Sequence, residues 1–159
     1  MNLRVGFGVD VHRLADGLTL MVGGKEIPSS FGAVGHSDAD VLLHAICDAL
    51  LGAANLRDIG FHFSDTDPKY KGIDSTILLK NVGDLLKSKN YRIGNLDCTV
   101  ILEKPKLNPH ILDMQKVIGR VLEIEEDCVS IKATTHEKVD SFGEGLAIKA
   151  YAVCLIEKV

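Results

Sequence analysis

The sequence predicts an α+β fold, in which a mixed four-stranded sheet carries helices on one face and a small hairpin accompanies it. Three observations support this prediction. The composition is that of an ordinary globular chain, with 46% hydrophobic and 25% charged residues. Three segments place apolar residues at helical spacing, and segments of strand character are interleaved with them. No internal repeat or linker divides the 159 residues, so we expect one domain over residues 1–159.

The first strand is predicted from an alternating pattern that begins at Leu3. Apolar residues alternate with a second series, which runs Arg4, Gly6, Gly8, Asp10 and His12. Side chains two apart in a strand lie on the same face, so Asp10 and His12 leave one side of the sheet together. Glycine weakens a strand and often marks a close approach by another group, which we expect at Gly6 and Gly8. The alternative is an edge strand whose two polar residues are solvated.

The other elements are predicted from turn and cap residues. Two short apolar runs around Gly23-Gly24 predict a hairpin, and a loop of small residues is expected at 28–35. Asp74 caps a predicted helix that ends near Lys89. Further strands are expected at 96–102, 129–133 and 146–156, a turn with two prolines at 103–109, and a helix at 110–122.

Another helix is predicted to open at His36-Ser37-Asp38 and to end near Ala54. Ser37 is a good N-cap, and Asp40 follows three residues later, like the acid of a capping box. His44 lies four residues from both Asp40 and Asp48, so all three share one side of the helix. A lone histidine beside an apolar stripe is more often a boundary residue of the core than a ligand.

Two loops are rich in groups that bind ligands. Residues 57–68, RDIGFHFSDTDP, combine Asp, Gly and Ser with Phe61 and Phe63, which a purely solvated connector would not need. Asx turns at Asp65 and Asp67 are the alternative explanation. Residues 134–145, TTHEKVDSFGEG, form a second polar and glycine-rich loop.

Charge and apolar content exclude several classes of protein. The net charge of −4 argues against a nucleic-acid-binding protein. No apolar run approaches the roughly 18–20 residues of a membrane span. The chain enters a strand almost at once, so we expect a cytoplasmic protein, or one of the plastid stroma or a similar organelle if a transit segment was removed. Cysteines in four apolar stretches are expected to be reduced core residues, namely Cys47, Cys98, Cys128 and Cys154.

Asp10, His12 and His44 together provide one carboxylate and two imidazoles. This is the ligand inventory of a catalytic zinc site with an open fourth position, whereas a structural zinc more often has cysteine ligands. Asp40, His44 and Asp48 form an alternative set along the helix, which would favour a harder ion such as Mg²⁺ or Mn²⁺.

Five motifs spread over the chain resemble those of one enzyme family. They are GVDVHRL, HSDADVLLH, DIGFHFSDTDP, the KPK turn and KATT followed by a glutamate. Their order and spacing resemble the 2-C-methyl-D-erythritol 2,4-cyclodiphosphate synthases of non-mevalonate isoprenoid biosynthesis. The resemblance implies a lyase that converts 4-diphosphocytidyl-2-C-methyl-D-erythritol 2-phosphate to the cyclic diphosphate and CMP. Because the substrate attacks its own diphosphate, such an enzyme must position the groups and neutralise charge, and it needs no protein nucleophile.

The resemblance also implies roles for individual residues. Asp10, His12 and His44 would bind Zn²⁺, and Glu137 would help bind a second divalent cation, Mg²⁺ or Mn²⁺. His36 and Thr135 would be catalytic, because they would steady the transition state. Substrate contacts are implied for Asp10, His12, His36, Ser37, Asp58, Ile59, Gly60, Phe63, Ser64, Asp65, Thr66, Asp67, Leu102, Lys104, Pro105, Lys106, Leu107, Asn108, Thr134, Thr135, Glu137 and Phe142. Residues 58–60 would hold the erythritol hydroxyls and residues 102–108 the cytidine.

The resemblance further implies a homotrimer with active sites between subunits and a central channel. The chain departs from the commoner family pattern after Glu137, where the loop is slightly shorter and lacks an arginine that reaches the phosphates. Lys138 and Phe142 are the candidates to replace the missing charge and ring. Two rival functions are a zinc-dependent phosphohydrolase, which would release inorganic phosphate, and a trimeric binding protein for isoprenoid diphosphates with a structural metal.

Overall fold

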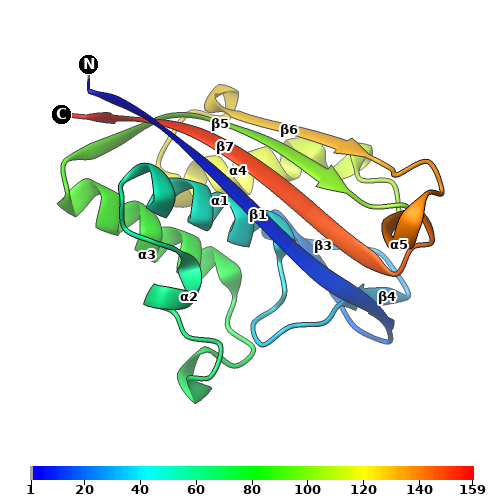
Figure 1. The fold of residues 1–159 in the computed structure, drawn as a ribbon. Coiled ribbons are helices and arrows are strands. Elements are labelled where there is room, and N and C mark those ends of the chain that lie inside the picture. The colour runs from blue at the N-terminus through cyan, green and yellow to red at the C-terminus, as the bar shows by residue number, and fades with distance from the viewer. Residues whose placement is uncertain (1) are drawn as a thin grey trace.

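A five-stranded mixed sheet forms one layer of the fold in the computed structural model, which describes residues 2–159 (Figure 1). The strand order is β4-β1-β7-β5-β6. The strands are β1 (Leu3–Asp16), β4 (Phe31–Ala33), β5 (Tyr91–Ile101), β6 (Val129–Thr134) and β7 (Ala147–Lys158). β5 and β6 pair in parallel and the other neighbours are antiparallel, which confirms a mixed sheet.

The predicted count of four strands is wrong, because the segment 28–35 is not only a loop. Its centre forms β4, which pairs with the end of β1 through Leu14 and Ala33 and through Asp16 and Phe31. Three residues with a glycine in the middle are too few to show an alternating pattern, and β1 itself extends beyond the alternation on which the prediction rested.

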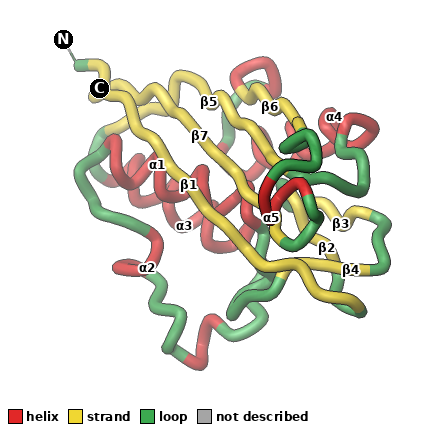
Figure 2. Tube along the Cα trace, turned by 45° about the vertical axis from the view of Figure 1, so that its right-hand side comes forward, coloured by secondary structure: helices red, strands yellow, loops and turns green. Residues whose placement is uncertain are grey.

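Three long helices cover one face of the sheet, as predicted (Figures 1 and 2). They are α1 (Val41–Ala53), α3 (Ser75–Ser88) and α4 (Ile111–Leu122). α1 is the central one, because it packs on β1 and β7 on one side and on α3 on the other. Most of its side chains are therefore fully buried in the core.

Gly6 and Gly8 of β1 face α1 at very short range. A Cβ atom at Gly8 would lie 2.0 Å from the carbonyl oxygen of Ala45, and one at Gly6 would lie 1.9 Å from that of Ala49. This is the close approach that the two glycines predict. The opposite face of β1 carries large apolar side chains and is exposed: Leu3, Val5, Phe7, Val9 and Val11.

The start of α1 differs from the prediction. Asp40, not Ser37, is the N-cap, and its carboxylate accepts a hydrogen bond from the backbone N–H of Leu43 at 3.1 Å. Ala39 has a φ of 57°, in the left-handed region, so the helix begins only after it. The Ser37 hydroxyl instead accepts from the N–H of Ala39, within a local turn.

The predicted hairpin is confirmed as β2 (Leu20–Val22) and β3 (Lys25–Ile27), and Asp74 is confirmed as the N-cap of α3. Both polar loops contain a short helix, α2 (Ile59–His62) in the first and α5 (Asp140–Gly143) in the second. Short 3₁₀ helices occupy Pro68–Tyr70, Asn108–His110 and Glu126–Cys128.

The cysteines are free, with Cys47, Cys98 and Cys154 buried and Cys128 half-buried. No helix within residues 2–159 has the length and apolar content needed to cross a membrane.

Candidate active site

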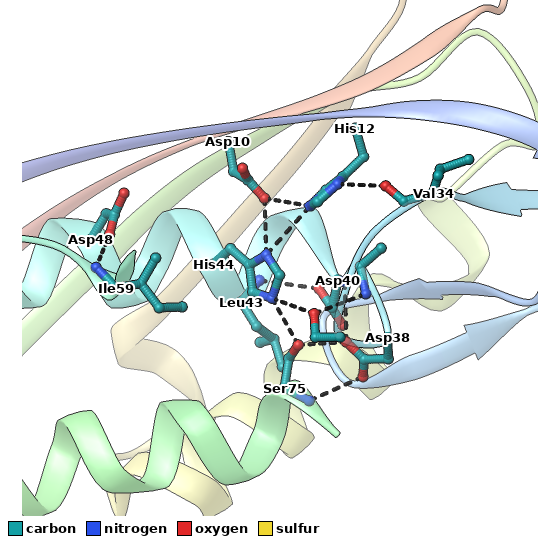
Figure 3. A network of polar contacts seen from close by, with 12 residues as sticks. Asp10, His12, Val34, Asp38, Asp40, Leu43, His44, Asp48, Ile59 and Ser75 are labelled. Atoms are coloured by element: carbon teal, nitrogen blue, oxygen red, sulfur yellow. Dashed lines mark hydrogen bonds and ion pairs between the residues drawn. The ribbon is translucent and has the colours of Figure 1, made fainter. Parts of the chain in front are cut away.

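Asp10 and His12 of β1 and His44 of the first turn of α1 converge in the space between the two elements (Figure 3). The Asp10 Oδ2 atom lies 2.8 Å from His12 Nε2 and 3.0 Å from His44 Nδ1. The two imidazole nitrogens are 3.3 Å apart. The strand period of two places Asp10 and His12 on the helix side of β1, and the close packing over Gly8 brings His44 to them.

Each imidazole is oriented by a contact at its other nitrogen. His12 Nδ1 donates to the carbonyl oxygen of Val34 at 2.9 Å, which leaves Nε2 facing Asp10. His44 Nε2 lies 2.9 Å from the hydroxyl of Ser75 and 3.2 Å from that of Ser37. The two inward imidazole nitrogens are therefore held in place by contacts outside the group, as is common for metal-binding histidines.

Asp10 and His12 shift each other's pKa. Burial alone would raise the pKa of Asp10, but hydrogen bonds and charge interactions with His12 and His44 lower it to about 2. Burial opposes the charging of His12, yet the Asp10 carboxylate raises the pKa of His12 above its ordinary value. A carboxylate thus lies beside an imidazole whose pKa it raises, at a site where a divalent cation would take the place of the proton.

The donor atoms fit a divalent metal ion. One ligand atom from each of Asp10, His12 and His44 lies within 4.8 Å of the other two, and among residues 2–159 they are the one such group of three His, Cys, Asp or Glu residues.

The alternative ligand set along α1 is wrong, since its two carboxylates are used elsewhere. Asp40 is fully buried and accepts from the backbone N–H groups of Gly23, Gly24 and Leu43. Asp48 accepts from the N–H of Ile59 at 2.7 Å.

A cavity of about 390 Å³ opens beside the three ligands. It brings together Asp10, His12 and His44 with several residues of the predicted substrate site: His36, Ser37, Ile59, Gly60, Phe63 and Asp65. Tyr70, Ile73 and Leu78 also line it, and sequence reasoning missed them because they belong to a turn and a helix without a distinctive motif. The cavity lining thus combines the polar ligands with apolar side chains.

Several predicted substrate residues shape the loop around this cavity and do not line it. Asp58 caps α2 by accepting from the N–H of Phe61 at 2.9 Å. The hydroxyls of Ser64 and Thr66 are 2.8 Å apart, and Asp67 caps the following 3₁₀ helix. His36 Nε2 donates to the carbonyl oxygen of Asp67 at 3.1 Å, which ties the loop to the segment before α1.

The predicted cytidine residues lie at a second, smaller cavity of about 110 Å³ at the ends of β5 and β6. It is lined by Leu102, Lys106, Leu107, Asn108, Thr134 and Thr135, together with Glu103 and Ala133. Lys104 and Lys138 line a third cavity nearby, while Pro105 lines none of the three. The predicted site residues therefore form two groups in one chain, one around the metal ligands and one around the β5–β6 edge.

Glu137 and Phe142 belong to the second group through the loop after β6. The Glu137 carboxylate accepts from the Thr135 hydroxyl at 3.3 Å, and Glu137 and Lys138 both have a positive φ. The Phe142 ring lies beneath the Lys149 ammonium, 4.3 Å from the ring centroid, and edge-on to the His136 ring. Glu137 is not part of the three-residue ligand group.

The fold and the site together define an α+β domain with a candidate metal centre, and comparison with known proteins gives its family. The YgbB family profile matches residues 3–157, so the chain belongs to the YgbB family. It is 58% identical over 153 residues to the 2-C-methyl-D-erythritol 2,4-cyclodiphosphate synthase of Porphyromonas gingivalis (strain ATCC BAA-308 / W83), covering 96% of this chain and 94% of that protein. The family predicted from the motifs, and with it the prediction of an enzyme, is confirmed.

Solved structures of similar fold support the assignment to this family. The "IspF (Plasmodium falciparum) CDP complex" matches with a TM-score of 0.87 at 37% identity, covering 99% of this chain and 98% of that one. A bifunctional IspDF from Campylobacter jejuni matches with a TM-score of 0.95 at 34% identity over 99% of this chain. The chain spans 42% of the length of that protein.

Proposed function

We propose that this chain cyclises 4-diphosphocytidyl-2-C-methyl-D-erythritol 2-phosphate to 2-C-methyl-D-erythritol 2,4-cyclodiphosphate with release of CMP. The observation that carries the proposal is the Asp10, His12 and His44 group in the lining of a cavity, in a chain of the YgbB family. The synthase of Porphyromonas supports the reaction, and the CDP complex of the Plasmodium protein supports a cytidine nucleotide as the ligand.

Zn²⁺ is the cation that we assign to the three ligands, because two imidazoles and one carboxylate are the ligand types of catalytic zinc sites. When bound, the ion supplies Lewis acidity toward a phosphoryl oxygen. The chain's own contribution is to hold Asp10 ionised, His12 and His44 oriented, and His36 and Ser37 at the wall of the same cavity. His36 and Ser37 then contact the 2-phosphate of the substrate and keep it near the diphosphate.

The remaining substrate contacts divide between the two groups of residues. In the metal group, Asp58, Ile59 and Gly60 hold the erythritol hydroxyls, and Phe63 and Asp65 line the same cavity. Ser64, Thr66 and Asp67 contact the substrate from the loop around it. In the second group, Leu102, Lys104, Pro105, Lys106, Leu107 and Asn108 hold the cytidine, and Thr134 and Thr135 contact the diphosphate. Glu137 helps to hold a second divalent cation, Mg²⁺ or Mn²⁺, and Thr135 steadies the transition state beside it.

We propose that the two groups meet between subunits of a homotrimer. Within one chain the metal ligands and the cytidine residues line different cavities. Each cavity of a single chain therefore contains only one of the two groups of residues that a complete active site needs. The sheet face opposite the helices is apolar and exposed along β1, and the Phe7 ring stacks on that of Tyr151 there. An exposed apolar face of this extent on a sheet is typical of an interface between proteins.

Lys138 is our candidate for the phosphate contact that the shortened loop lacks, since it lines a cavity together with Lys104. Phe142 is less suited to that role, because its ring is covered by the Lys149 ammonium and packs on His136. The cytoplasmic location expected from the sequence stays a prediction.

Phosphorus NMR tests the proposed reaction directly. The protein is incubated with the cytidylyl substrate and Mg²⁺, with and without a chelator that removes zinc. We expect CMP and one cyclic diphosphate product, and loss of both with the chelator. Inorganic phosphate as the product would indicate the rival phosphohydrolase. Binding of the substrate without turnover, unaffected by Asp10→Asn, would indicate the rival binding protein.

A further inference from the structure

A partly buried chain of hydrogen bonds leads from His44 through Ser75 to Asp38 (Figure 3). It begins at His44 Nε2, which lies 2.9 Å from the hydroxyl of Ser75, the first residue of α3. Ser75 is fully buried and is one of two fully buried polar side chains among residues 2–159, the other being Asp40. From Ser75 the chain continues to Asp38, because the Ser75 hydroxyl hydrogen-bonds to Asp38 Oδ1.

The direction of each hydrogen bond follows from the partners. Asp38 Oδ2 accepts from the backbone N–H of Ser75 at 3.0 Å, and an ionised carboxylate can only accept. The Ser75 hydroxyl must therefore donate its one proton to Asp38 and present a lone pair to His44. His44 Nε2 must then carry the proton and donate it to Ser75. In the neutral imidazole, Nδ1 then has the lone pair, and it lies on the side of Asp10 and His12 where the cation would bind.

This tautomer is the one that a metal ligand requires at this position. A neutral imidazole binds a cation through the nitrogen that has no proton, and the other nitrogen usually donates to a carboxylate or another acceptor that fixes the ring. Ser37 is a second acceptor, but its hydroxyl is farther from Nε2, at 3.2 Å, and it also accepts from the N–H of Ala39. Ser75 is closer, fully buried and oriented by a carboxylate.

The same contacts join α3 to the segment that carries the cavity residues. The N–H of Asp38 donates to the carbonyl oxygen of Ile73 at 3.0 Å, and the N–H of Gly72 donates to that of His36 at 2.7 Å. Backbone hydrogen bonds thus join residues 36–38 to residues 72–75 beside the metal ligands. A shift of the Ser75 backbone would move both His44 and the His36 end of the cavity.

We propose that Ser75 and Asp38 are positioning residues of the metal centre, which hold His44 in the tautomer and orientation that bind the cation through Nδ1. The proposal rests on the metal site of the proposed function and not on the reaction. Removing an acceptor of this kind typically weakens metal binding by about 10- to 100-fold. The test therefore measures zinc affinity in the absence of any substrate.

The experiment compares the zinc dissociation constants of Ser75→Ala, Ser75→Thr and Ser88→Ala by competition with a chromophoric chelator. Ser88 is the matched control, because it is an exposed serine at the other end of α3 whose hydroxyl donates to the carbonyl oxygen of Leu85. We expect a loss of about 10- to 100-fold in Ser75→Ala, recovery of most of the affinity in Ser75→Thr, and no change in Ser88→Ala. Unchanged affinity in Ser75→Ala, even with a lower melting temperature of the metal-free protein, would overturn the proposal.

A second measurement uses the unaltered protein and so does not depend on the folding of a variant. Nitrogen-15 NMR of the zinc-loaded protein reports which imidazole nitrogen of His44 carries the proton and how fast that proton exchanges with water. We expect the proton on Nε2 and slow exchange. A proton on Nδ1, or exchange as fast as in an exposed histidine, would exclude Ser75 as the acceptor. Failure of the unaltered protein to bind zinc would overturn the metal site itself, which is a distinguishable result.

Discussion

Gly8 of β1 and Ala45 of α1 are in backbone contact, so close that a Cβ atom at Gly8 would lie 2.0 Å from the Ala45 carbonyl oxygen. Ala45 directly follows His44, and Gly8 lies two residues before Asp10. The glycine therefore sets the height of the helix above the strand at the point where the metal ligands must meet. A side chain here would move α1 and with it His44.

Gly8→Ala is expected to lose both stability and zinc affinity. The added methyl group meets backbone atoms that have no rotamer to escape into, and overpacking of this kind costs typically about 1–3 kcal/mol. Gly52→Ala is the control, because a Cβ there meets nothing within 4 Å and alanine favours the helix by about 0.5–1 kcal/mol. Urea unfolding and zinc titration measure the two effects. A Gly8→Ala protein as stable as Gly52→Ala, with full zinc affinity, would show that the strand does not set the position of His44.

His44→Ala is expected to reduce the zinc content from about one ion per chain to nearly none, since a site with three protein ligands does not hold zinc tightly with two. The measurement is elemental analysis after dialysis against a zinc buffer. His110→Ala is the control, because this histidine stands at the start of α4 and belongs to no ligand group within residues 2–159. If His44→Ala keeps its zinc, the ligand set is incorrect.

The sequence pattern was sufficient to predict the features that depend on local backbone geometry. The period of two placed Asp10 and His12 on one face, and Gly6 and Gly8 marked the close approach that α1 makes. It was insufficient for β4, whose three residues are held by their pairing with β1 and have no pattern of their own. An alternating strand also does not reveal which face is covered. In this chain the glycine face is buried, and the apolar face is exposed.

The residues of the candidate site also differ in how far the sequence predicts their contacts. Ser37 and Asp38 have the residue types of a helix start, but Ala39 in the left-handed region delays α1, and both side chains bind elsewhere. Ser75 carries no signal, because a serine in the first turn of a helix is ordinary. Its partner Asp38 is 37 positions away, so only the tertiary structure brings them together.

Zinc affinity is expected to fall as the pH is lowered through the pKa of His12. Contact with the Asp10 carboxylate raises this pKa above the ordinary value of 6.5, against the effect of burial, so the metal-free protein retains the His12 proton to a higher pH than an ordinary histidine does. Zinc must displace it, and below the raised pKa the affinity should fall about tenfold per pH unit. Asp10 has a pKa of about 2, so it stays ionised above pH 5 and does not contribute to the pH dependence of zinc affinity there. Chelator competition from pH 5.5 to 8 checks this, and a flat profile would contradict it.

Asp40→Ala is expected to destabilise the metal-free protein by roughly 3 kcal/mol or more, because three backbone donors lose their acceptor in the core. The carboxylate accepts from Gly23 at 2.9 Å, Gly24 at 2.7 Å and Leu43 at 3.1 Å, so it joins the hairpin to the start of α1. Asp74→Ala provides the comparison. It removes the exposed N-cap of α3, for which a loss of about 1 kcal/mol is typical. Equal losses of unfolding free energy at one protein concentration would mean that Asp40 acts as a helix cap alone.

Val5→Lys is expected to dissociate the proposed homotrimer. Val5 is 69% exposed on the apolar face of β1, and a lysine buried there between subunits would have its charge unpaired. A penalty of roughly 3 kcal/mol per subunit would weaken assembly by more than about 100-fold.

Leu112→Lys is the matched control, because Leu112 is also 69% exposed but lies on α4, in the helix layer. Sedimentation equilibrium should show monomers for Val5→Lys and trimers for Leu112→Lys and the unaltered chain. Because the cytidine and metal groups would then be separated, the monomer should still bind zinc while losing cyclisation. A trimeric Val5→Lys protein would place the subunit interface on another face.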